Sequence, residues 1–256
     1  MSIFHTAERV SNVDKSDNII FQRSLFAYYE AAKIVSGQVL EIGTGEGYGL
    51  EIISKKADRF VTIDKFDQQV NSKDFPNVEF VKMNIPPLTG FANDTFDYCI
   101  SFQVIEHIEN DLEYLKEIQR VLKPGGKFIC TTPNIKQSLT RNPWHVREYT
   151  LQELETLALK AFTSVDKRGV FGNATINAYN EKNKAAIRKI TRFDFFNLQY
   201  RLPRQLLQIP YDILNRMNRK KLLENNFSLA SEITINDYSA APVNDDALDL
   251  FYIMQK

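Results

Sequence analysis

A glycine-dense run early in the chain has the residue types and spacing to hold a small anionic or zwitterionic ligand. Residues 39–49 read VLEIGTGEGYG, a short apolar strand that ends in an acid and a turn that opens a helix. Glycines permit positive φ and let the backbone approach a ligand closely. The N-terminus of a helix offers free N–H groups and a positive dipole end, which favour a carboxylate or a phosphate. A tight strand-to-helix turn without a ligand is the alternative that stays open.

The glycine spacing argues against a dinucleotide site. Such a site has the pattern G-x-G-x-x-G, so its third glycine would fall at position 48, where this sequence has Tyr48. The pattern here is E-x-G-x-G-x-G and begins at Glu41. The ligand of this turn is therefore expected to differ from NAD or FAD.

Strands alternate with helices around this run, which predicts a parallel sheet with helices on both faces and right-handed crossovers. Ligands of such sheets bind outside the carboxyl ends of the strands. Thr150 and Glu153 form a predicted capping box for one helix, and 123–126 reads as a turn. The apolar patterns predict strands at 39–42, 60–63, 78–82, 98–102, 127–132, 164–170 and 248–254, and helices at 16–35, 50–55, between strands two and three, at 110–122 and at 151–161.

Five segments in this order resemble the class I S-adenosylmethionine (SAM)-dependent methyltransferases, of the methyltransferase type 11/12 kind. They are the glycine run, Asp64 after strand two, Asn84-Ile85 after strand three, residues 96–108 around strand four, and the turn at 122–128. The resemblance covers about residues 36–170. It implies an α/β fold with a Rossmann-like, doubly wound, seven-stranded sheet whose C-terminal strand is antiparallel.

The resemblance implies that the glycine turn and the strand ends bind SAM, with S-adenosylhomocysteine as the product. Asp64 corresponds to the acid that binds the ribose, since a carboxylate has two acceptor oxygens for the two donors of a vicinal diol; a helix N-cap is the alternative role. Asn84 would meet the edge of adenine and Ile85 its face. The implied cofactor-binding set is Glu41 and Gly43 at the methionine moiety, Phe102 and Gln103 beneath the sulfonium, and Thr44, Gly45, Gly47, Tyr48, Asp64, Lys65, Asn84 and Ile85.

A weaker resemblance lies upstream of the glycine run. Glu8-Arg9-Val10 and Phe26-Ala27-Tyr28-Tyr29 look like segments of bacterial methyltransferases that act on glycans, lipids or secondary metabolites. In such enzymes the N-terminal helix closes over the cofactor. The resemblance therefore implies that Arg23 or Tyr28 touches SAM, and the equal alternative is that both face solvent or core.

Two histidines are candidates for the base that a hydroxyl acceptor requires. His107 follows strand four at the predicted active-site edge, where a purely structural connector is the alternative. His145 lies in the segment 142–149, which resembles the H-V-x-E-[FY] segment of glycan and lipid methyltransferases. There Trp144 or Tyr149 could wall the acceptor pocket and Arg147 could bind an acidic substrate; an ordered loop is the alternative.

We expect no metal in this site. Related enzymes that use a metal carry E-x-x-E-H after strand four, whereas residues 103–107 read QVIEH. A neutral amide replaces the first carboxylate, and magnesium prefers carboxylate oxygens. We also expect no DNA partner, because the N-P-P-Y motif of DNA amino-methyltransferases is not matched: proline does not directly follow Asn84.

A long insertion separates the last two predicted strands. Residues 173–230 carry 11 Lys or Arg and 4 Asp or Glu, so this stretch is +7 in a chain whose net charge is zero. Helices broken at Pro203 and Pro210 are expected, because proline interrupts helical hydrogen bonding. The domain prediction is a SAM-binding core at 1–172, a basic helical cap at 173–240 over the acceptor pocket, and a final core strand at 241–256. A basic amphipathic surface attracts anionic lipid headgroups or diphosphate-linked substrates; a cap that only packs on the core is the alternative.

Composition sets the remaining expectations. At 256 residues and 25% charged residues, the chain fits one large domain or a core with an elaboration. Cys99 and Cys130 lie in apolar strands and are expected to be buried reduced thiols. The first nine residues lack a secretory layout, so we expect a cytoplasmic protein, with peripheral contact to an anionic membrane left open.

The predicted function is methyl transfer from SAM to a small-molecule, sugar or lipid-linked acceptor, with oxygen favoured as the acceptor atom. Two alternatives stay open. One is an RNA or protein methyltransferase that uses the basic cap, although Arg219-Lys220-Lys221 is the only compact basic block. The other is a SAM-binding partner subunit without turnover.

Overall fold

The computed structural model describes residues 10, 12–68, 73–192, 194, 196–225 and 231–256. The chain divides into two compact units. The sheet unit comprises Leu25–Gln137, Arg147–Phe171 and Ala240–Lys256. The helical unit comprises Met1–Ser24, Ser138–Val146 and Gly172–Ser239. Each unit is described by itself below.

The strands form one eight-stranded sheet in the order β3-β2-β1-β4-β5-β8-β6-β7. The pairs β1–β2, β1–β4, β2–β3 and β4–β5 are parallel, and β8 runs antiparallel to both β5 and β6. This confirms the Rossmann-like, doubly wound fold with an antiparallel C-terminal strand. The strands are β1 Gln38–Ile42, β2 Arg59–Asp64, β3 Val78–Lys82, β4 Phe96–Phe102, β5 Leu122–Pro133, β6 Ser164–Gly172, β7 Tyr238–Pro242 and β8 Asp249–Gln255.

Two details of the predicted sheet are wrong. The sheet has an eighth strand, β7, which crosses the predicted boundary at residue 240 between the helical cap and the final core strand; its sequence, YSAAP, is too short to give a clear period-two pattern. The predicted turn at 123–126 lies inside β5. There the register with β4 shifts, so that Phe96 pairs with Leu122 and Tyr98 with Lys127. The extra residues bulge out of the ladder without ending the strand.

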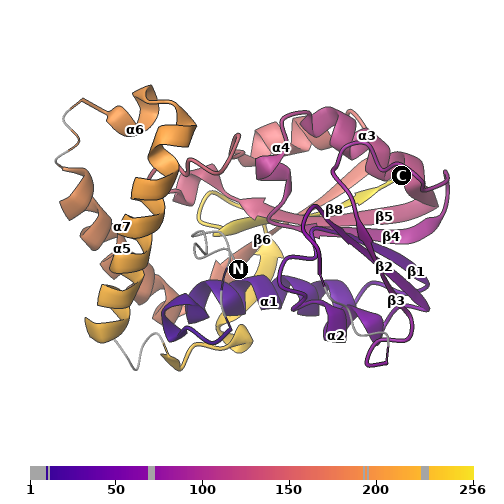
Figure 1. Ribbon diagram of the computed structural model, residues 1–256, viewed down its shortest axis with the longest axis horizontal. Coiled ribbons are helices and arrows are strands. Elements are labelled where there is room, and N and C mark those ends of the chain that lie inside the picture. Colours follow the sequence, from indigo (N-terminus) through magenta and orange to yellow (C-terminus); the bar gives the residue numbers. More distant parts are fainter. Residues whose placement is uncertain (1–9, 11, 69–72, 193, 195, 226–230) are drawn as a thin grey trace. The chain divides into compact units, whose positions relative to one another are not determined.

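Short and long helices complete the two units. In the sheet unit α3 and α4 cover one face of the sheet and α2 the other (Figure 1). The predicted capping box of α4 is present, with the Thr150 hydroxyl accepting from the Glu153 N–H. The helices are α1 Asn18–Ala32, α2 Leu50–Ser54, α3 Asp111–Val121, α4 Leu151–Ala158, α5 Ala174–Thr191, α6 Leu198–Arg201 and α7 Arg204–Asn225, with 3₁₀ turns η1 Lys15–Asp17, η2 Ile105–His107, η3 Ile135–Gln137 and η4 Ile235–Asp237.

Two helix predictions differ from the described structure. Between β2 and β3 no helix occurs at 65–68 or 73–77, and the rest of that predicted helix, 69–72, lies outside the described residues. Pro210 does not end a helix but lies inside α7. Only one intrahelical hydrogen bond is lost there, and the neighbouring turns on both sides hold the 22-residue helix together. Pro203, in contrast, stands between α6 and α7 as predicted.

The core of the sheet unit lies between the sheet and its helices. Fully buried side chains from β1, β4 and β5 meet Tyr114, Leu115 and Ile118 of α3. Cys99 and Cys130 are buried free thiols within this core, as predicted. The core packs against the middle of the strands, and polar groups occupy the carboxyl ends of the strands.

The inserted chain is attached to the sheet unit at the carboxyl edge of the parallel strands. β6 runs antiparallel to β8, and β8 runs antiparallel to β5, so β6 ends at the same edge as β5. β8 starts at that edge as well. No described helix is long and apolar enough to cross a bilayer.

Candidate cofactor site

The glycine turn begins where β1 ends and adopts backbone angles that demand glycine. Gly43, Gly45 and Gly47 have φ of +94°, +56° and +80°, in the left-handed region that other residues rarely adopt. The amides of Gly43 and Thr44 both donate to the Ile63 carbonyl, at 2.8 and 3.1 Å. The turn is therefore tied to the end of the neighbouring strand β2.

The turn rests on a buried carboxylate. Glu41 is 1% exposed, and its Oε1 accepts a 2.7 Å hydrogen bond from the Tyr28 hydroxyl. Its Oε2 accepts from the Thr62 hydroxyl, which lies 2.6 Å from that of Thr44. Glu41 and Thr62 are register partners on β1 and β2, which explains why the strands bring them together. The chain of contacts runs from α1 through Glu41 to the turn.

Burial raises the pKa of the Glu41 carboxyl to about 7. The hydroxyls of Thr62 and Tyr28 oppose this shift by hydrogen bonding to the charged form. Burial also raises the pKa of Tyr28 well above its ordinary value, and the neighbouring Glu41 adds to that shift. Tyr28 therefore stays a hydrogen-bond donor to the carboxylate at neutral pH.

Tyr28 lies so close to the turn that Gly49 admits no side chain. A Cβ on Gly49 would lie 2.0 Å from Cε1 of the Tyr28 ring. The same ring contacts Phe102 edge to face, with 4.8 Å between the centroids. Tyr28 thus packs between the glycine turn and the end of β4.

Asp64 ends β2 and holds the glycine turn through its carboxylate. Its Oδ2 accepts from the Gly45 amide at 3.0 Å, and its Oδ1 accepts from the Phe66 amide at 2.9 Å. Each oxygen keeps acceptor capacity for a further donor. The residue is half-buried, and the exposed Lys65 that follows lies 5.1 Å from the centroid of the Phe66 ring.

A second unusual backbone conformation lies directly after β4. Gln103 has φ of +58°, which is uncommon for a residue with a side chain and is held by surrounding contacts. Its amide donates to the Thr131 carbonyl at 2.9 Å, and its Nε2 donates to the Thr131 hydroxyl at 3.2 Å. Phe102 before it is half-buried.

The remaining residues predicted to bind the cofactor are more open. Asn84 is exposed after β3, whereas Ile85 is half-buried and packs on the core of the sheet unit. Tyr48 is half-buried within the glycine turn. All of them lie beyond the carboxyl ends of β1, β2 and β3, the edge at which ligands of this topology bind. Of the upstream segments, Glu8 and Arg9 lie outside the described residues, and Arg23 belongs to the helical unit.

The candidate bases lie in different units. His107 closes η2 in the sheet unit, where it is half-buried and its amide donates to the Val104 carbonyl at 2.9 Å. His145 belongs to the helical unit and is 8% exposed. Its Nε2 lies 2.9 Å from Nδ2 of Asn142. The amide nitrogen can only donate, so Nε2 acts as the acceptor.

Two residues predicted to line the acceptor pocket meet at an acid that sequence reasoning missed. Arg147 Nη1 and the Tyr149 hydroxyl both donate to Asp111 Oδ2, at 2.6 and 3.0 Å. Asp111 starts α3 and is 7% exposed. An acid in the first helical turn was visible in the sequence, but its partners 36 and 38 residues later were not.

Trp144, the third predicted pocket residue, is held within the helical unit. Its indole Nε1 donates to Asp212 Oδ1 on α7 at 3.0 Å. Arg204 of the same helix donates to the His145 carbonyl at 3.2 Å. The segment 138–146, which leaves the sheet after β5, is thus bound to the inserted helices.

Comparisons with known proteins agree with this geometry. A methyltransferase-domain family model matches residues 40–130. A probable S-adenosylmethionine-dependent methyltransferase of Mycolicibacterium smegmatis is 30% identical over 263 residues, which cover 97% of this chain and 93% of the relative. This chain belongs to the S-adenosylmethionine-dependent methyltransferases.

Two further matches extend the comparison. A probable S-adenosylmethionine-dependent methyltransferase of Mycobacterium tuberculosis is 31% identical over 193 residues, covering 71% of this methyltransferase and 69% of the relative. A solved structure from Thermotoga maritima is described as a possible histamine N-methyltransferase. It matches with a TM-score of 0.54 at 14% identity, and the match covers 93% of this chain and 91% of the Thermotoga chain. The latter match shows the fold alone.

The residues of this methyltransferase fit its cofactor, SAM. Asp64 offers two carboxylate oxygens for a ribose diol. A Cβ at Gly45 would meet nothing within 4 Å, so the backbone there is open to a ligand. Bound SAM supplies a methyl group on a cationic sulfonium; the protein holds the cofactor and aligns an acceptor.

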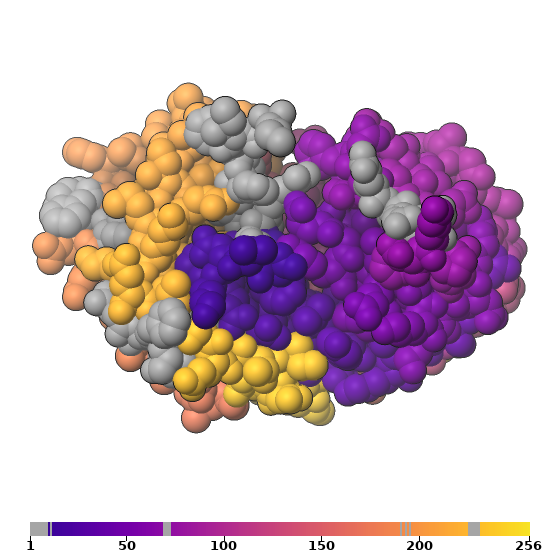
Figure 2. All heavy atoms as spheres, turned by 60° about the horizontal axis from the view of Figure 1, so that its bottom comes forward, coloured from indigo at the N-terminus to yellow at the C-terminus, as the bar shows by residue number. Residues whose placement is uncertain are grey.

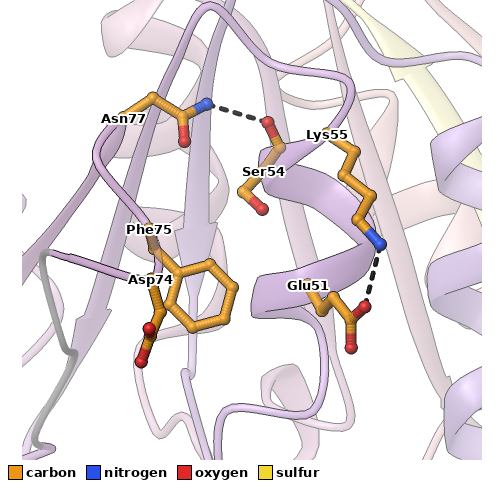
Figure 3. Close-up of a pocket in the computed structure, with 6 residues that line it drawn as sticks. All are labelled: Glu51, Ser54, Lys55, Asp74, Phe75 and Asn77. Atoms are coloured by element: carbon orange, nitrogen blue, oxygen red, sulfur yellow. Dashed lines mark hydrogen bonds and ion pairs between the residues drawn. The ribbon is translucent and has the colours of Figure 1, made fainter.

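A surface hollow of the methyltransferase lies away from the cofactor site. It encloses about 420 Å³ between α2 and the 73–77 segment, and Asn77 donates to the Ser54 carbonyl at its rim (Figure 3). α2 ends and β3 begins here, so the hollow lies at the amino edge of the sheet. It is therefore separate from the cofactor site.

Proposed function

We propose that this methyltransferase transfers the methyl group of SAM to an oxygen of a small-molecule, sugar or lipid-linked acceptor, with His107 as the base. The observation that supports this is the position of His107. It comes four residues after Gln103, whose strained backbone directly follows β4, and it stands on a short 3₁₀ turn at the carboxyl edge. A hydroxyl needs a base to remove its proton as the methyl group is transferred, and imidazole suits that role near neutral pH.

His145 is the second candidate in this proposal. Its Nε2 accepts from Asn142 and its carbonyl accepts from Arg204, so the ring and its backbone are both oriented. Such a ring can serve as base only through its other nitrogen. We therefore rank His107 first.

The acceptor side is proposed to involve Trp144, Arg147 and Tyr149. Asp111 orients Arg147 and Tyr149 in the sheet unit, while Trp144 is fixed to α7 in the helical unit. The inserted chain is attached at the carboxyl edge through β6 and β8. These attachments support our proposal that the helical unit covers the acceptor pocket.

An isotope experiment tests the acceptor class. The protein is incubated with methyl-labelled SAM and with separated small-molecule, glycan, lipid, RNA and protein fractions of a bacterial extract. We expect label in the small-molecule, glycan or lipid fraction, and an O-methyl signal when the product is examined by carbon NMR. Label confined to RNA or protein, or a methyl group on nitrogen or carbon, would overturn this assignment.

Paired histidine variants test the base. His107→Gln should lower kcat by about 10²- to 10⁴-fold, the range of general base catalysis, while S-adenosylhomocysteine binding stays unchanged. His145→Gln is the matched control and should lower kcat less. Full activity of His107→Gln would remove the residue from the mechanism.

A further inference from the structure

Helix α7 carries its apolar side chains outward. Within the first four turns, Leu206, Ile209, Ile213 and Met217 are 64%, 69%, 54% and 63% exposed. Their spacing of three and four residues places them on one face of the helix. Leu214, 46% exposed, widens this face. We refer to these five side chains as the α7 stripe.

The opposite face of α7 holds the helix in its unit with polar groups. Asn218 is 9% exposed, and its amide donates to Asn183 of α5 at 2.8 Å. The Arg219 side chain is 12% exposed and forms an ion pair with Asp17 of η1 at 2.9 Å. Leu222 is buried on the same side. The helix is therefore docked by these contacts, and the stripe is not the face that packs in the helical unit.

This arrangement is the reverse of the usual one, in which the apolar face of a helix is turned toward the protein core. Contiguous exposed apolar surface rimmed by polar residues marks an interaction site in soluble proteins. Part of α7, coloured orange to gold, faces the viewer in Figure 2. The α7 stripe therefore indicates a binding site for an apolar partner.

Positive charge accompanies the stripe. Lys220 and Lys221 are exposed and follow Met217 on the same helix, three and four residues further along the chain. Arg201, also exposed, precedes its start. The stretch 173–230 carries +7, whereas the rest of the chain carries −7. An anionic partner would thus be attracted to the helical unit and repelled by the rest.

We propose that the α7 stripe docks this methyltransferase on an anionic lipid surface, with Lys220 and Lys221 at the headgroups. A helix of this kind lies in the plane of the membrane, its apolar side chains at the acyl boundary and its lysines in the polar layer. Each basic residue near the surface strengthens the attraction to anionic lipids. This inference does not depend on the identity of the methyl acceptor.

A second copy of the chain fits the stripe less well. The segment from Leu206 to Met217 is about 16 Å long at 1.5 Å per residue and carries five apolar side chains. A specific protein interface uses roughly 20 to 30 residues on each side. Two stripes facing each other would also bring together two positively charged surfaces. Neither the small contact area nor the repulsion of like charges counts against an anionic lipid surface.

Flotation with vesicles tests the proposal. The full-length protein is mixed with phosphatidylcholine vesicles that contain either no phosphatidylglycerol or a third of it. We expect binding to the anionic vesicles only, weakened by high salt. The variants Ile213→Glu and Lys220→Glu should each reduce the affinity by ~10-fold or more. Their matched controls, Leu159→Glu and Lys160→Glu, change exposed residues at the end of α4 in the sheet unit and should bind like the wild type.

Two measurements keep the result interpretable. Each variant should keep the melting-temperature increase that S-adenosylhomocysteine causes, which shows an intact fold and cofactor site. The mass in solution is followed by light scattering. Equal vesicle binding of Ile213→Glu and Leu159→Glu, no binding of the wild type to anionic vesicles, or a dimer that Ile213→Glu dissociates would each overturn the proposal.

Discussion

Two carboxylates near the glycine turn have opposite surroundings, and this difference assigns their roles. Glu41 is buried and engaged by the hydroxyls of Tyr28 and Thr62. Asp64 is half-buried and engaged by backbone amides, which leaves acceptor capacity toward solvent. We therefore expect Asp64 to contact the cofactor and Glu41 to support the turn from below.

The variant Asp64→Ala tests the first role. It removes the acceptor of the Gly45 and Phe66 amides and of the ribose diol, so the dissociation constant of S-adenosylhomocysteine should rise about 100-fold, as expected for the loss of two charge-assisted hydrogen bonds. Isothermal titration calorimetry measures this. Asp67→Ala, three residues on, removes an exposed carboxylate that pairs with Lys82 and serves as the control. Equal affinity of the two variants would refute the ribose assignment.

The second role predicts a pH-dependent stability. The pKa of Glu41 in the folded protein, about 7, is above its ordinary value of 4.5, so the folded state binds a proton more tightly than the unfolded state. The stability from this group is fully present below pH 4.5 and is lost as the pH rises toward 7. Between pH 5.5 and 8, the free energy of unfolding of the wild type should therefore fall by about 2 kcal/mol relative to that of Glu41→Gln.

Urea unfolding of both proteins across this range measures the difference. Glu51→Gln is the control, because Glu51 is exposed and Lys55 lowers its pKa. The difference in unfolding free energy between the wild type and Glu51→Gln should stay constant across these pH values. A constant gap between the wild type and Glu41→Gln would contradict the buried-carboxylate interpretation.

At the residue scale, the sequence identified the groups that are consecutive and missed those that meet through the fold. The glycine turn and Asp64 belong to local patterns with a known physical use. Thr62 looked like an ordinary strand residue until its register placed it opposite Glu41. Asp111 likewise gains its meaning only from Arg147 and Tyr149. Pairings of this kind depend on strand register and loop path, which no local pattern encodes.

At the scale of elements, the connection between β5 and α4 links the two units in sequence. Its middle, 138–146, is held by helices whose contacting residues come 58 to 68 residues later in the chain. Arg141 Nη1 donates to the Gln199 carbonyl at 3.1 Å, and Trp144 donates to Asp212. Trp144, which we propose lies on the acceptor side, therefore depends on α7 for its position.

The variant Asp212→Ala tests this dependence. Loss of the acceptor for the indole N–H should loosen the loop, and since the chain has a single tryptophan, its fluorescence reports on Trp144 alone. We expect stronger quenching by acrylamide and a raised KM for the acceptor, with S-adenosylhomocysteine affinity unchanged. Asp212→Asn keeps an acceptor oxygen and should restore both properties. Unchanged quenching in Asp212→Ala would show that the loop is held by other contacts.

Element prediction succeeded where hydrophobic periodicity is strong. The buried strands of the parallel sheet, and α3 with its apolar face, agree with their predicted ranges to within a few residues. The method failed at β7 and at Pro210. β7 forms because β6 offers a free edge, and α7 continues through proline because its other hydrogen bonds persist. Both outcomes are decided by neighbours rather than by local sequence.

At the scale of the whole molecule, charge is distributed unevenly although its sum is zero. The +7 of residues 173–230 balances −7 elsewhere, and the isoelectric point is near 6.8. Near that pH no net repulsion separates two molecules, and the positive part of one attracts the negative part of another. The sequence alone revealed this imbalance, because counting charges requires no structure.

This uneven charge predicts association at low salt. The Debye length is about 30 Å at 0.01 M and about 8 Å at 0.15 M salt, so attraction between molecules should be marked at the lower concentration and screened at the higher. Static light scattering at pH 6.8 should therefore give a second virial coefficient that rises with added salt. The variant Lys220→Glu/Lys221→Glu makes the molecule net negative and lowers the charge of the insertion, so its coefficient at low salt should be higher than that of the wild type. A coefficient independent of salt in both proteins would show that the two charges compensate within one molecule rather than between molecules.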